Sequence, residues 1–341
     1  MSISEGVELV DEFTILLMPT GELFNDLFPA KVLERLSAFA KIRRNTSTKP
    51  TRDEIIEMAK DVDAIITSWG SPLIDGDIVS HCPKLKFIGH AAGSIKPIVT
   101  REVFEKGVTV SSSAAIIAEF VGEACLLSAI AGLRNLIQND RDMRNGNWRG
   151  VDYHIHDSLF RQDVGLVGLG MTARAFLKLL VPFECKVRVY DPFVSSEDAE
   201  KLGAEWYDLD ELLESSSVIS LHAASLPETR HMIDARRLGL IKDGSLLINT
   251  ARGALVDEEA LIEELSQGRF KAVLDVYEQE PLPVDSPLRK LSNVILTPHI
   301  AGPAYRRRWE MALAMINDCQ LVLTNKSAKY AVDGSILDRI A

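Results

Sequence analysis

The stretch DVGLVGLGMTARAF, residues 163–176, decides the fold of this chain. An apolar run leads directly into two closely spaced glycines, and the residues after them have the spacing of a helix. Gly168 permits a tight turn, Gly170 lets a bound pyrophosphate approach the backbone, and Ala173 is small enough for the helix to pack against the strand. A glycine loop between a strand and a helix is the setting in which this motif binds a dinucleotide.

The residues around this loop strengthen that interpretation. Met171 and Thr172 begin the predicted helix, whose unpaired N–H groups attract phosphate. Asp191 ends the next predicted strand, at the place where an acid accepts hydrogen bonds from the ribose hydroxyls. It would also repel a 2′-phosphate, and residues 192–195 offer no base to hold one. The sequence therefore predicts NAD rather than NADP; the alternative is a structural turn followed by a solvated aspartate.

Strands alternate with helices along the first third of the chain. Short apolar runs predict strands at residues 14–18, 64–67, 87–89 and 108–110. Helical spacing is found at residues 30–42 and again over a long segment, 114–138. A polar arm, residues 139–158, follows and is predicted to be irregular. This βαβ order predicts a parallel sheet with helices on both faces.

A second series of the same kind begins at residue 163. The predicted strands are 164–169, 187–190, 218–221, 246–248, 272–274 and 294–296, and one of the helices between them is 258–265. A long amphipathic helix is predicted within residues 306–325. We therefore expect two Rossmann-like, doubly wound α/β domains with parallel sheets. Residues 1–113 and 302–341 form the predicted substrate domain, and the predicted cofactor domain, residues 114–301, is inserted in it.

Composition excludes several kinds of protein. The chain has 341 residues, of which 46% are hydrophobic and 26% charged, and its formal net charge is -11. An acidic chain without long basic runs is not expected to bind nucleic acid or anionic membranes, so we interpret the three arginines at 306–308 as a solvated helix face. The acidic opening residues predict no signal peptide, and the four isolated cysteines predict reduced thiols in the cytoplasm and no metal site.

Three charged side chains follow predicted strands of the second half, where open α/β sheets bind their ligands. Arg252 comes just after the run 246–248, and its planar guanidinium suits a carboxylate. Glu280 and His299 follow the next two strands, and a carboxylate beside a histidine stabilises its imidazolium form for proton transfer. Taken alone, Arg252 would more often pair with an acid such as Asp257, and a single histidine would more often be a core or turn residue. Together, behind an intact glycine loop, they predict hydride transfer to or from a nicotinamide.

At this point the sequence resembles the D-isomer-specific 2-hydroxyacid dehydrogenases. Six segments occur in the order and spacing of that family: GLVGLGMTA, YDP, SLHAASLPETRHMI, LLINTARGALVDEEAL, VLDVYEQEPLP and LTPHIAGP. The resemblance implies that Arg252 holds the substrate carboxylate and carbonyl. It implies that His299, paired with Glu280, takes the hydroxyl proton as hydride moves to the nicotinamide, and that Asp275 lies near the nicotinamide carboxamide. The expected cofactor-binding residues are Gly168, Gly170, Met171, Thr172, Asp191, His222, Thr250, Ala251 and Asp275.

The same family binds the substrate carboxylate through backbone N–H groups of a glycine-rich loop in the other domain. The segment GHAAGSIKP falls at that place, so Ala92, Gly93 and Ser94 are expected to line the substrate site. The sequence departs from the family at Lys96 and Pro97, because Asp-Asn is usual there. The lysine either meets an anionic group of the substrate or is solvated.

Other departures and additions affect the pocket. Ala224 stands where the family usually has proline, and it alters the local turn beside the cofactor. The large aromatic residues Trp69, Tyr305 and Trp309 either wall the substrate pocket or pack between the domains. In the first case they favour a 2-keto acid bulkier than glyoxylate.

The leading hypothesis is an NAD-dependent D-2-hydroxyacid dehydrogenase that acts as a 2-ketoacid reductase. A formate dehydrogenase on the same fold carries glutamine in place of Glu280, whereas a phosphite dehydrogenase is harder to separate. A non-metabolic NAD(H)-binding corepressor keeps the same three residues. The resemblance also implies a homodimer formed through residues 114–138 and 139–158. The chain ends soon after its last helix, so no C-terminal regulatory domain is expected.

Overall fold

A computed structural model of the chain describes residues 13–149 and 156–337. The chain divides into two compact units, of which the first is residues 1–117 with 304–341 and the second is residues 118–303. The sequence prediction placed these divisions at 113/114 and 301/302. In both descriptions the second unit interrupts the first, so the first is discontinuous along the chain. The functional role of each unit stays a prediction at this stage.

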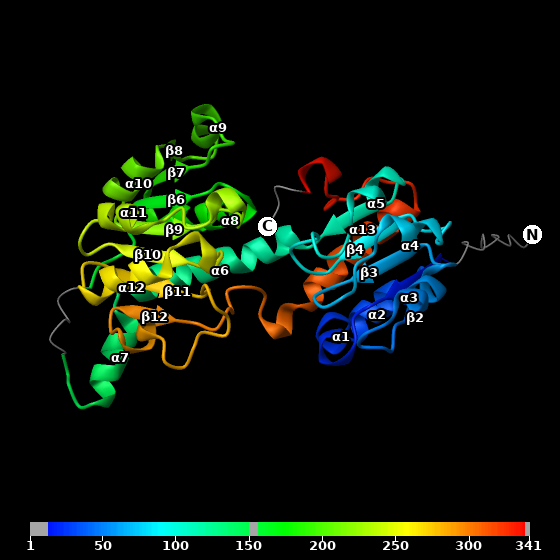
Figure 1. The fold of residues 1–341 in the computed structure, drawn as a ribbon, viewed down its shortest axis with the longest axis horizontal. Coiled ribbons are helices and arrows are strands. Elements are labelled where there is room, and N and C mark those ends of the chain that lie inside the picture. Colours follow the sequence, from blue (N-terminus) through cyan, green and yellow to red (C-terminus); the bar gives the residue numbers. More distant parts are fainter. Residues whose placement is uncertain (1–12, 150–155, 338–341) are drawn as a thin grey trace, which may run out of the picture. The chain divides into compact units, whose positions relative to one another are not determined.

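The first unit is built on a five-stranded sheet (Figure 1). Its strands are β1 Phe13–Leu17, β2 Ala40–Arg44, β3 Ala64–Thr67, β4 Phe87–His90 and β5 Thr109–Ser112. They lie in the order β2-β1-β3-β4-β5, and all neighbouring pairs are parallel. The chain runs outward from β1 in one direction and from β3 in the other. The strand order therefore reverses between β1 and β3, as the doubly wound prediction requires.

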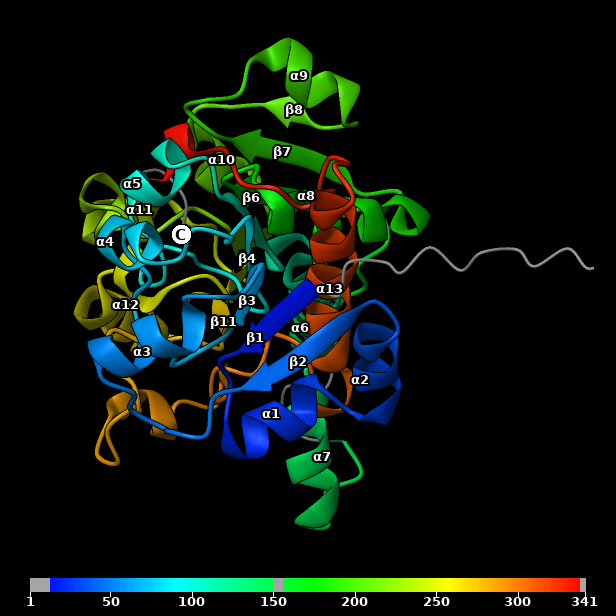
Figure 2. The same ribbon diagram turned by 90° about the vertical axis from the view of Figure 1, so that its right-hand side faces the viewer.

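Helices cover both faces of this sheet. They are α1 Gly21–Leu27, α2 Ala30–Ser37, α3 Arg52–Ala59, α4 Gly76–Ser80, α5 Arg101–Glu105 and α13 Trp309–Leu323. Residues of α1, α2 and α13 share one apolar cluster with the sheet, and residues of α3, α4 and α5 share another. Figure 2 shows α13 and α2 on one side of the sheet and α3 on the other. The last long helix of the chain therefore completes the layer begun by the first two.

The predicted helix at residues 30–42 is wrong over its second half. Helix α2 ends at Ser37, and β2 pairs in parallel with β1, with Ala40 opposite Phe13. Ala40 and Ile42 alternate with Lys41 and Arg43, which is the period of a strand. Because β2 is an edge strand, its charged residues are tolerated, and they hide the strand from a search for apolar runs.

The second unit is built on a seven-stranded parallel sheet. Its strands are β6 Asp163–Val167, β7 Lys186–Tyr190, β8 Glu205–Trp206, β9 Val218–Leu221, β10 Leu246–Asn249, β11 Lys271–Leu274 and β12 Val294–Leu296. They lie in the order β12-β11-β10-β9-β6-β7-β8, with every neighbouring pair parallel. The order reverses between β6 and β9. The glycine loop follows β6, so it lies at the position where sheets of this kind bind a ligand.

Two helical layers enclose this sheet. The helices are α6 Ala114–Leu133, α7 Leu136–Arg144, α8 Met171–Leu180, α9 Ser196–Lys201, α10 Leu209–Ser215, α11 Ala235–Leu240 and α12 Glu258–Ser266. Apolar side chains of α6, α8 and α9 pack on one face, and those of α10, α11 and α12 pack on the other. Helix α6 is long and apolar enough to cross a membrane by length and composition alone, a test that the core helix of a soluble protein also passes.

The segment after α6 differs from its prediction. A continuous helix over residues 114–138 was expected, but Asn135 adopts a left-handed conformation with φ 49° and separates α6 from α7. Helix α7 then continues to Arg144, so the first part of the arm predicted as irregular is helical. Residues 150–155 of that arm lie outside the described residues.

Candidate active site

Three loops of the second unit meet at one edge of its sheet. The parallel register places Asn249 of β10 beside Leu274 of β11, and Leu274 beside Leu296 of β12. The residues that follow these strands therefore leave the sheet side by side. They carry the three predicted catalytic residues, Arg252, Glu280 and His299.

His299 and Glu280, the two residues predicted to act as an acid/base pair, are in contact. The imidazole Nδ1 lies 2.6 Å from Glu280 Oε2. The side chains remain 51% and 37% exposed, so both are accessible to a ligand. The second carboxylate oxygen, Oε1, accepts a hydrogen bond from the Tyr277 backbone N–H at 3.1 Å. Glu280 is thereby held from its own loop, and it fixes the proton of a neutral His299 on Nδ1, which leaves Nε2 as the basic nitrogen.

Asp275 holds the loop that carries His299. Its carboxylate is 2% exposed and accepts three hydrogen bonds. The donors are the Thr297 hydroxyl at 2.6 Å, the Ile300 N–H at 2.8 Å and the Ala301 N–H at 2.8 Å. The Asp275 carbonyl also accepts from the His299 N–H at 2.9 Å. Asp275 was predicted as a cofactor contact, and its visible role within this chain is to position His299.

His299 itself has an uncommon backbone conformation. Its φ is 54°, in the left-handed region that side chains other than glycine rarely adopt. The bonds from Asp275 to residues on both sides of it compensate for this conformation. A strained residue held by a buried hydrogen-bond network is a frequent feature of catalytic sites.

Tyr277 joins the loop of Glu280 to the end of β12. Its hydroxyl donates to the Thr297 carbonyl at 2.8 Å and to the Leu274 carbonyl at 3.0 Å. Burial raises the pKa of Tyr277 to about 12, so the hydroxyl stays protonated and remains a donor at physiological pH. This side chain was not predicted from the sequence, because a tyrosine beside a strand is more often ordinary packing.

Arg252 is presented by a turn that Asn249 closes. The buried Asn249 amide donates to the Arg252 carbonyl at 3.0 Å, and its oxygen accepts from the Ala251 N–H at 3.1 Å. The Arg252 guanidinium is exposed and donates to the Ala251 carbonyl at 2.6 Å. Among the described residues no acid pairs with it. Asp257, the acid with which a purely structural Arg252 was expected to pair, instead caps α12 by accepting from the Ala260 N–H at 3.1 Å.

Gly253 brings the arginine turn against the loop of Glu280. A Cβ atom at Gly253 would overlap the backbone of Tyr277 and Glu278. The contact is backbone to backbone, so no side chain can move aside to relieve it. Glycine at this position therefore sets the separation between the turn of Arg252 and the carboxylate loop.

We predict that Gly253→Ala lowers kcat/KM by about 10²-fold, because an added methyl group displaces the two loops by roughly 1 Å. Gly239→Ala in α11 is the matched control, since a Cβ atom there meets nothing within 4 Å. Steady-state kinetics and thermal melts of both variants provide the measurement. Equal kcat/KM values for Gly253→Ala and the wild type would contradict the packing argument.

A second histidine–glutamate pair lies on the neighbouring loop and was missed by the sequence reading. His231 Nε2 contacts Glu278 Oε1, and Arg230 lies 3.6 Å from the same oxygen. The His231 N–H donates to the Ala254 carbonyl at 2.8 Å. This pair ties the segment before α11 to the arginine turn and to the carboxylate loop. The segment around His231, TRH, is too short to indicate such a pair from the sequence alone.

The glycine loop has the geometry that the motif predicted. Gly168 has φ 99°, and a Cβ atom there would lie 2.8 Å from the Ala223 backbone nitrogen. At Gly170 a Cβ atom meets nothing within 4 Å, which leaves the approach to the N-terminus of α8 open. Ala173 is fully buried in the apolar cluster under that helix. Met171 and Thr172 form the first turn of α8, as expected.

Asp191 connects the glycine loop to the next strand. Its carboxylate accepts hydrogen bonds from the Leu169 N–H at 2.8 Å and from the Phe193 N–H at 2.9 Å. The side chain is only partly buried, so its remaining lone pairs face solvent. An anion fixed in this way by two backbone donors is suited to accept the hydroxyl groups of a ribose.

His222 follows β9 and lies against the turn of Gly168. Both ring nitrogens are buried, and neither has a hydrogen-bond partner within the described residues. Burial lowers the pKa of His222 to about 3, so the ring is neutral, with one donor and one acceptor. Buried polar atoms without partners call for a ligand or a water. Thr250, another predicted cofactor residue, is buried and lies 3.2 Å from Cys125 Sγ. These features fit a dinucleotide bound across β6 and β9.

The predicted substrate residues lie in the first unit. Ala92, Gly93 and Ser94 follow β4, at the carboxyl edge of the five-stranded sheet. Lys96 is exposed, which agrees with either interpretation of that residue.

The aromatic residues separate into two groups. Trp69 and Tyr305 are 42% and 68% exposed. The Arg308 guanidinium lies over both rings, 5.4 Å from that of Trp69 and 3.8 Å from that of Tyr305. Trp309 instead packs on the apolar cluster of the first unit beneath Lys31. Arg308 also forms an ion pair with Asp26 at 3.0 Å, so the prediction of a solvated arginine is wrong at this residue.

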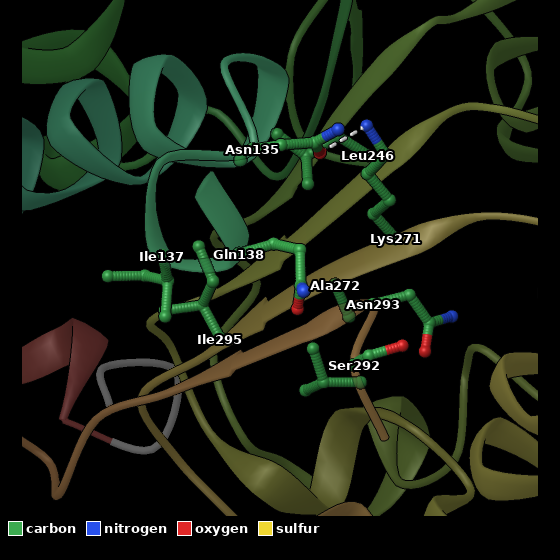
Figure 3. A pocket seen from close by; sticks show the side chains of 11 residues that line it. Asn135, Ile137, Gln138, Leu246, Lys271, Ala272, Ser292, Asn293 and Ile295 are labelled. Atoms are coloured by element: carbon green, nitrogen blue, oxygen red, sulfur yellow. Dashed lines mark hydrogen bonds between the residues drawn. The ribbon is translucent and has the colours of Figure 1, made fainter. Parts of the chain in front are cut away.

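A small cavity lies at the opposite edge of the second unit's sheet (Figure 3). It holds about 30 Å³, enough for roughly one water molecule. Lys271 and Asn135 border it and are joined by a hydrogen bond of 2.6 Å. Its position beside the starts of β10, β11 and β12 separates it from the catalytic candidates, and we assign it to packing.

Comparison with known proteins gives one consistent family. Residues 126–301 match the NAD binding domain of the D-isomer specific 2-hydroxyacid dehydrogenases. Glyoxylate reductase of Korarchaeum cryptofilum is 35% identical over 269 residues, which cover 77% of this chain and 80% of that protein. D-3-phosphoglycerate dehydrogenase of Methanocaldococcus jannaschii is 32% identical over 324 residues, which cover 93% of this chain but 59% of that longer protein.

A solved structure agrees with these sequence relatives. A glyoxylate reductase from Paecilomyes thermophila superposes with a TM-score of 0.76 at 26% identity, and the match covers 95% of this chain and 99% of that one. The two parallel-sheet domains are thus those of a known fold. The chain is an NAD-binding oxidoreductase that acts on the CH–OH group of 2-hydroxy acids, and it belongs to the D-isomer specific 2-hydroxyacid dehydrogenase family.

Proposed function

We propose that this enzyme uses His299 and Glu280 for acid/base catalysis and Arg252 to hold the substrate, and that it works as a reductase of 2-keto acids. The observation that carries the proposal is the 2.6 Å contact between His299 and Glu280 on the sheet edge that also presents Arg252. Substrate carboxylate and carbonyl offer the planar oxygen pair that a guanidinium binds. The same edge therefore combines an anion clamp with a proton donor.

When bound, NADH would supply the hydride that reduces the keto carbon of the substrate. His299, as imidazolium, donates its Nε2 proton to the carbonyl oxygen, and the product leaves as a 2-hydroxy acid. Glu280 stabilises the imidazolium before that transfer and orients the ring after it. Arg252 polarises the carbonyl and holds the carboxylate. In the reverse direction His299 takes the hydroxyl proton.

We predict that Arg252→Lys lowers kcat/KM for a 2-keto acid by about 10²-fold, because an ammonium cannot bind the carboxylate and carbonyl in the bidentate geometry. The protein should remain folded, since the guanidinium is exposed and its one hydrogen bond within the described residues is to the Ala251 carbonyl. Steady-state kinetics with circular dichroism tests this. Lys178→Arg, a change on the exposed side of α8, is the control. A normal rate, or an unfolded variant, would count against the clamp.

The His299–Glu280 contact supports this proposal over one rival, a formate dehydrogenase. Formate oxidation transfers hydride without a hydroxyl proton, so an acid/base pair has no role in it. A corepressor would need no such pair, although it can retain one. Tight NADH binding without turnover of any 2-keto acid would favour the corepressor.

NAD is proposed as the preferred cofactor over NADP. Asp191 carries a negative charge at the ribose position and is fixed by two backbone donors. A 2′-phosphate would meet this charge, and residues 192–195 provide no arginine or lysine to offset it. A kcat/KM with NADPH equal to that with NADH would contradict this preference.

A substrate bulkier than glyoxylate is supported by Trp69 and Tyr305. Both rings are exposed, and the Arg308 guanidinium lies over each of them while Asp26 offsets its charge. Rigid aromatic surfaces in the substrate unit suit an apolar or aromatic side chain. We therefore expect kcat/KM for phenylpyruvate to exceed that for glyoxylate. The reverse order would indicate that the rings serve packing instead.

A cytoplasmic homodimer is the proposed form of the enzyme. Apolar side chains on α6 and α7 are exposed in the single chain: Leu127, Ile130, Leu136 and Ile137 are 64%, 37%, 53% and 39% exposed. A second copy that covers them would remove this apolar surface from water. All four cysteines are free thiols, as expected of a cytoplasmic protein.

We predict that Leu127→Glu shifts the protein from dimer to monomer, because the carboxylate would be buried without a partner in the interface. Sedimentation velocity at micromolar concentration measures this. Val284→Glu is the matched control, since Val284 is 92% exposed and lies outside both helices. A wild-type monomer, or a dimer in the Leu127→Glu variant, would refute this interface.

A further inference from the structure

The loop after β4 has its carbonyl groups turned into the protein. The Ser68 hydroxyl donates to the Ala91 carbonyl at 2.7 Å. The Ser112 hydroxyl donates to the carbonyls of Ala92 and Gly93, at 3.2 Å and 2.6 Å. These serines follow β3 and end β5, the two strands that flank β4 in the sheet. Three successive carbonyls are thus bound from both sides.

His90 binds the carbonyl of the next residue in the loop, Ser94. Its ring is 2% exposed, and Nδ1 lies 3.0 Å from the Thr67 hydroxyl at the end of β3. The ring is also hydrogen-bonded to the Ser94 backbone, in a contact that raises the pKa of the ring and is therefore a donation to a carbonyl. Burial outweighs this and lowers the pKa of His90 to about 4, so the ring is neutral at physiological pH. A neutral imidazole has one acceptor for Thr67 and one donor for Ser94.

These bonds to the carbonyls leave the backbone N–H groups of the loop to be accounted for. With the carbonyls bound inside, the N–H groups of Ala92, Gly93 and Ser94 have no acceptor among the described residues. A Cβ atom at Gly93 would meet only an Ile117 methyl at 3.6 Å, so no backbone crowds this residue. Successive N–H groups without acceptors are available to donate hydrogen bonds to an anion.

We propose that His90 is a positioning residue for substrate binding: it joins Thr67 to Ser94 and so holds the 92–94 loop with its N–H groups directed at the substrate carboxylate. This inference rests on the proposed function, because the carboxylate is that of the 2-keto acid. His90 makes no contact with the substrate in this account. Its loss should therefore weaken substrate binding and leave the chemical step and the NADH site intact.

The test compares His90→Leu with His90→Gln in the full-length enzyme. Leucine fills the space but forms neither hydrogen bond, whereas the glutamine amide can accept from Thr67 and donate to Ser94. We expect His90→Leu to raise KM for the best 2-keto acid at least about tenfold, with kcat within about threefold and the NADH dissociation constant unchanged. His90→Gln should recover most of the loss. A merely structural role would move kcat, KM and NADH binding together.

Two further variants keep the test decisive. Thr67→Val removes the hydroxyl that contacts the His90 ring, with little change in side-chain volume. We expect this variant also to raise KM, so it provides the test if His90→Leu does not fold. His81→Leu is the control, since His81 is exposed just after α4 and, within the described residues, the one hydrogen bond of its ring is with the Asp77 carbonyl at 2.9 Å. It should keep wild-type kinetics.

The outcomes distinguish a failure of the proposed function from a failure of the role proposed for His90. If the wild-type enzyme reduces none of the 2-keto acids tested, the proposed function fails, and this inference fails with it. If the wild type is active and a folded His90→Leu variant keeps its KM, only the role of His90 is refuted. The same holds if His90→Gln is as impaired as His90→Leu, because the hydrogen bonds would then not be what matters.

Discussion

One buried carboxylate, that of Asp275, governs the geometry of the candidate active site. It follows β11 and accepts three hydrogen bonds from the loop after β12. These bonds hold the residues on both sides of His299, whose backbone has a left-handed conformation. In this conformation the His299 imidazole contacts the Glu280 carboxylate. The Tyr277 N–H donates a hydrogen bond to that carboxylate and holds it in place. The contact between His299 and Glu280 is thus a product of hydrogen bonds between neighbouring strand ends.

The two units place polar groups at strand ends by the same physical means. In the second unit Asn249, Asp275 and Tyr277 fix the loops that carry charged side chains. In the first unit Ser68, Ser112 and His90 fix a loop whose N–H groups remain open. Buried hydrogen bonds are costly to break, so they define loop conformation more sharply than apolar packing does. Within each unit, buried hydrogen bonds thereby hold the candidate loops in one conformation.

Several strands, the glycine loop and the positions of the candidate residues were predictable from the sequence. Parallel strands buried on both faces read as apolar runs, which is why β3 and β9 were predicted with their observed bounds. Gly168, Gly170 and Ala173 were each predicted to have a distinct steric task, and the structure agrees with those of Gly168 and Ala173. The candidate catalytic residues were chosen because strand ends are where sheets of this class bind ligands, and their roles stay a prediction.

What was missed depends on contacts between distant residues. The edge strand β2 carries charges, and the break at Asn135 lies in a sequence of helical spacing. Arg308 was read as solvated because its partner Asp26 lies far away in the chain. The crowding at Gly253 and the second pair, His231 with Glu278, could not be foreseen, since both need the fold before the contact exists. Local pattern identifies which residues stand at strand ends, and tertiary structure decides what each one touches.

The most direct test of the account is NADH oxidation by the wild type and by His299→Ala. The 2-keto acids to use are glyoxylate, hydroxypyruvate, pyruvate, phenylpyruvate and 3-phosphohydroxypyruvate, with NADH binding measured in parallel. The account predicts turnover of at least one substrate by the wild type and a loss of at least about 10²-fold in the variant, with NADH binding unchanged. Turnover that survives in the variant would contradict the role of His299. Absence of turnover in a wild type that still binds NADH would contradict the proposed reaction itself.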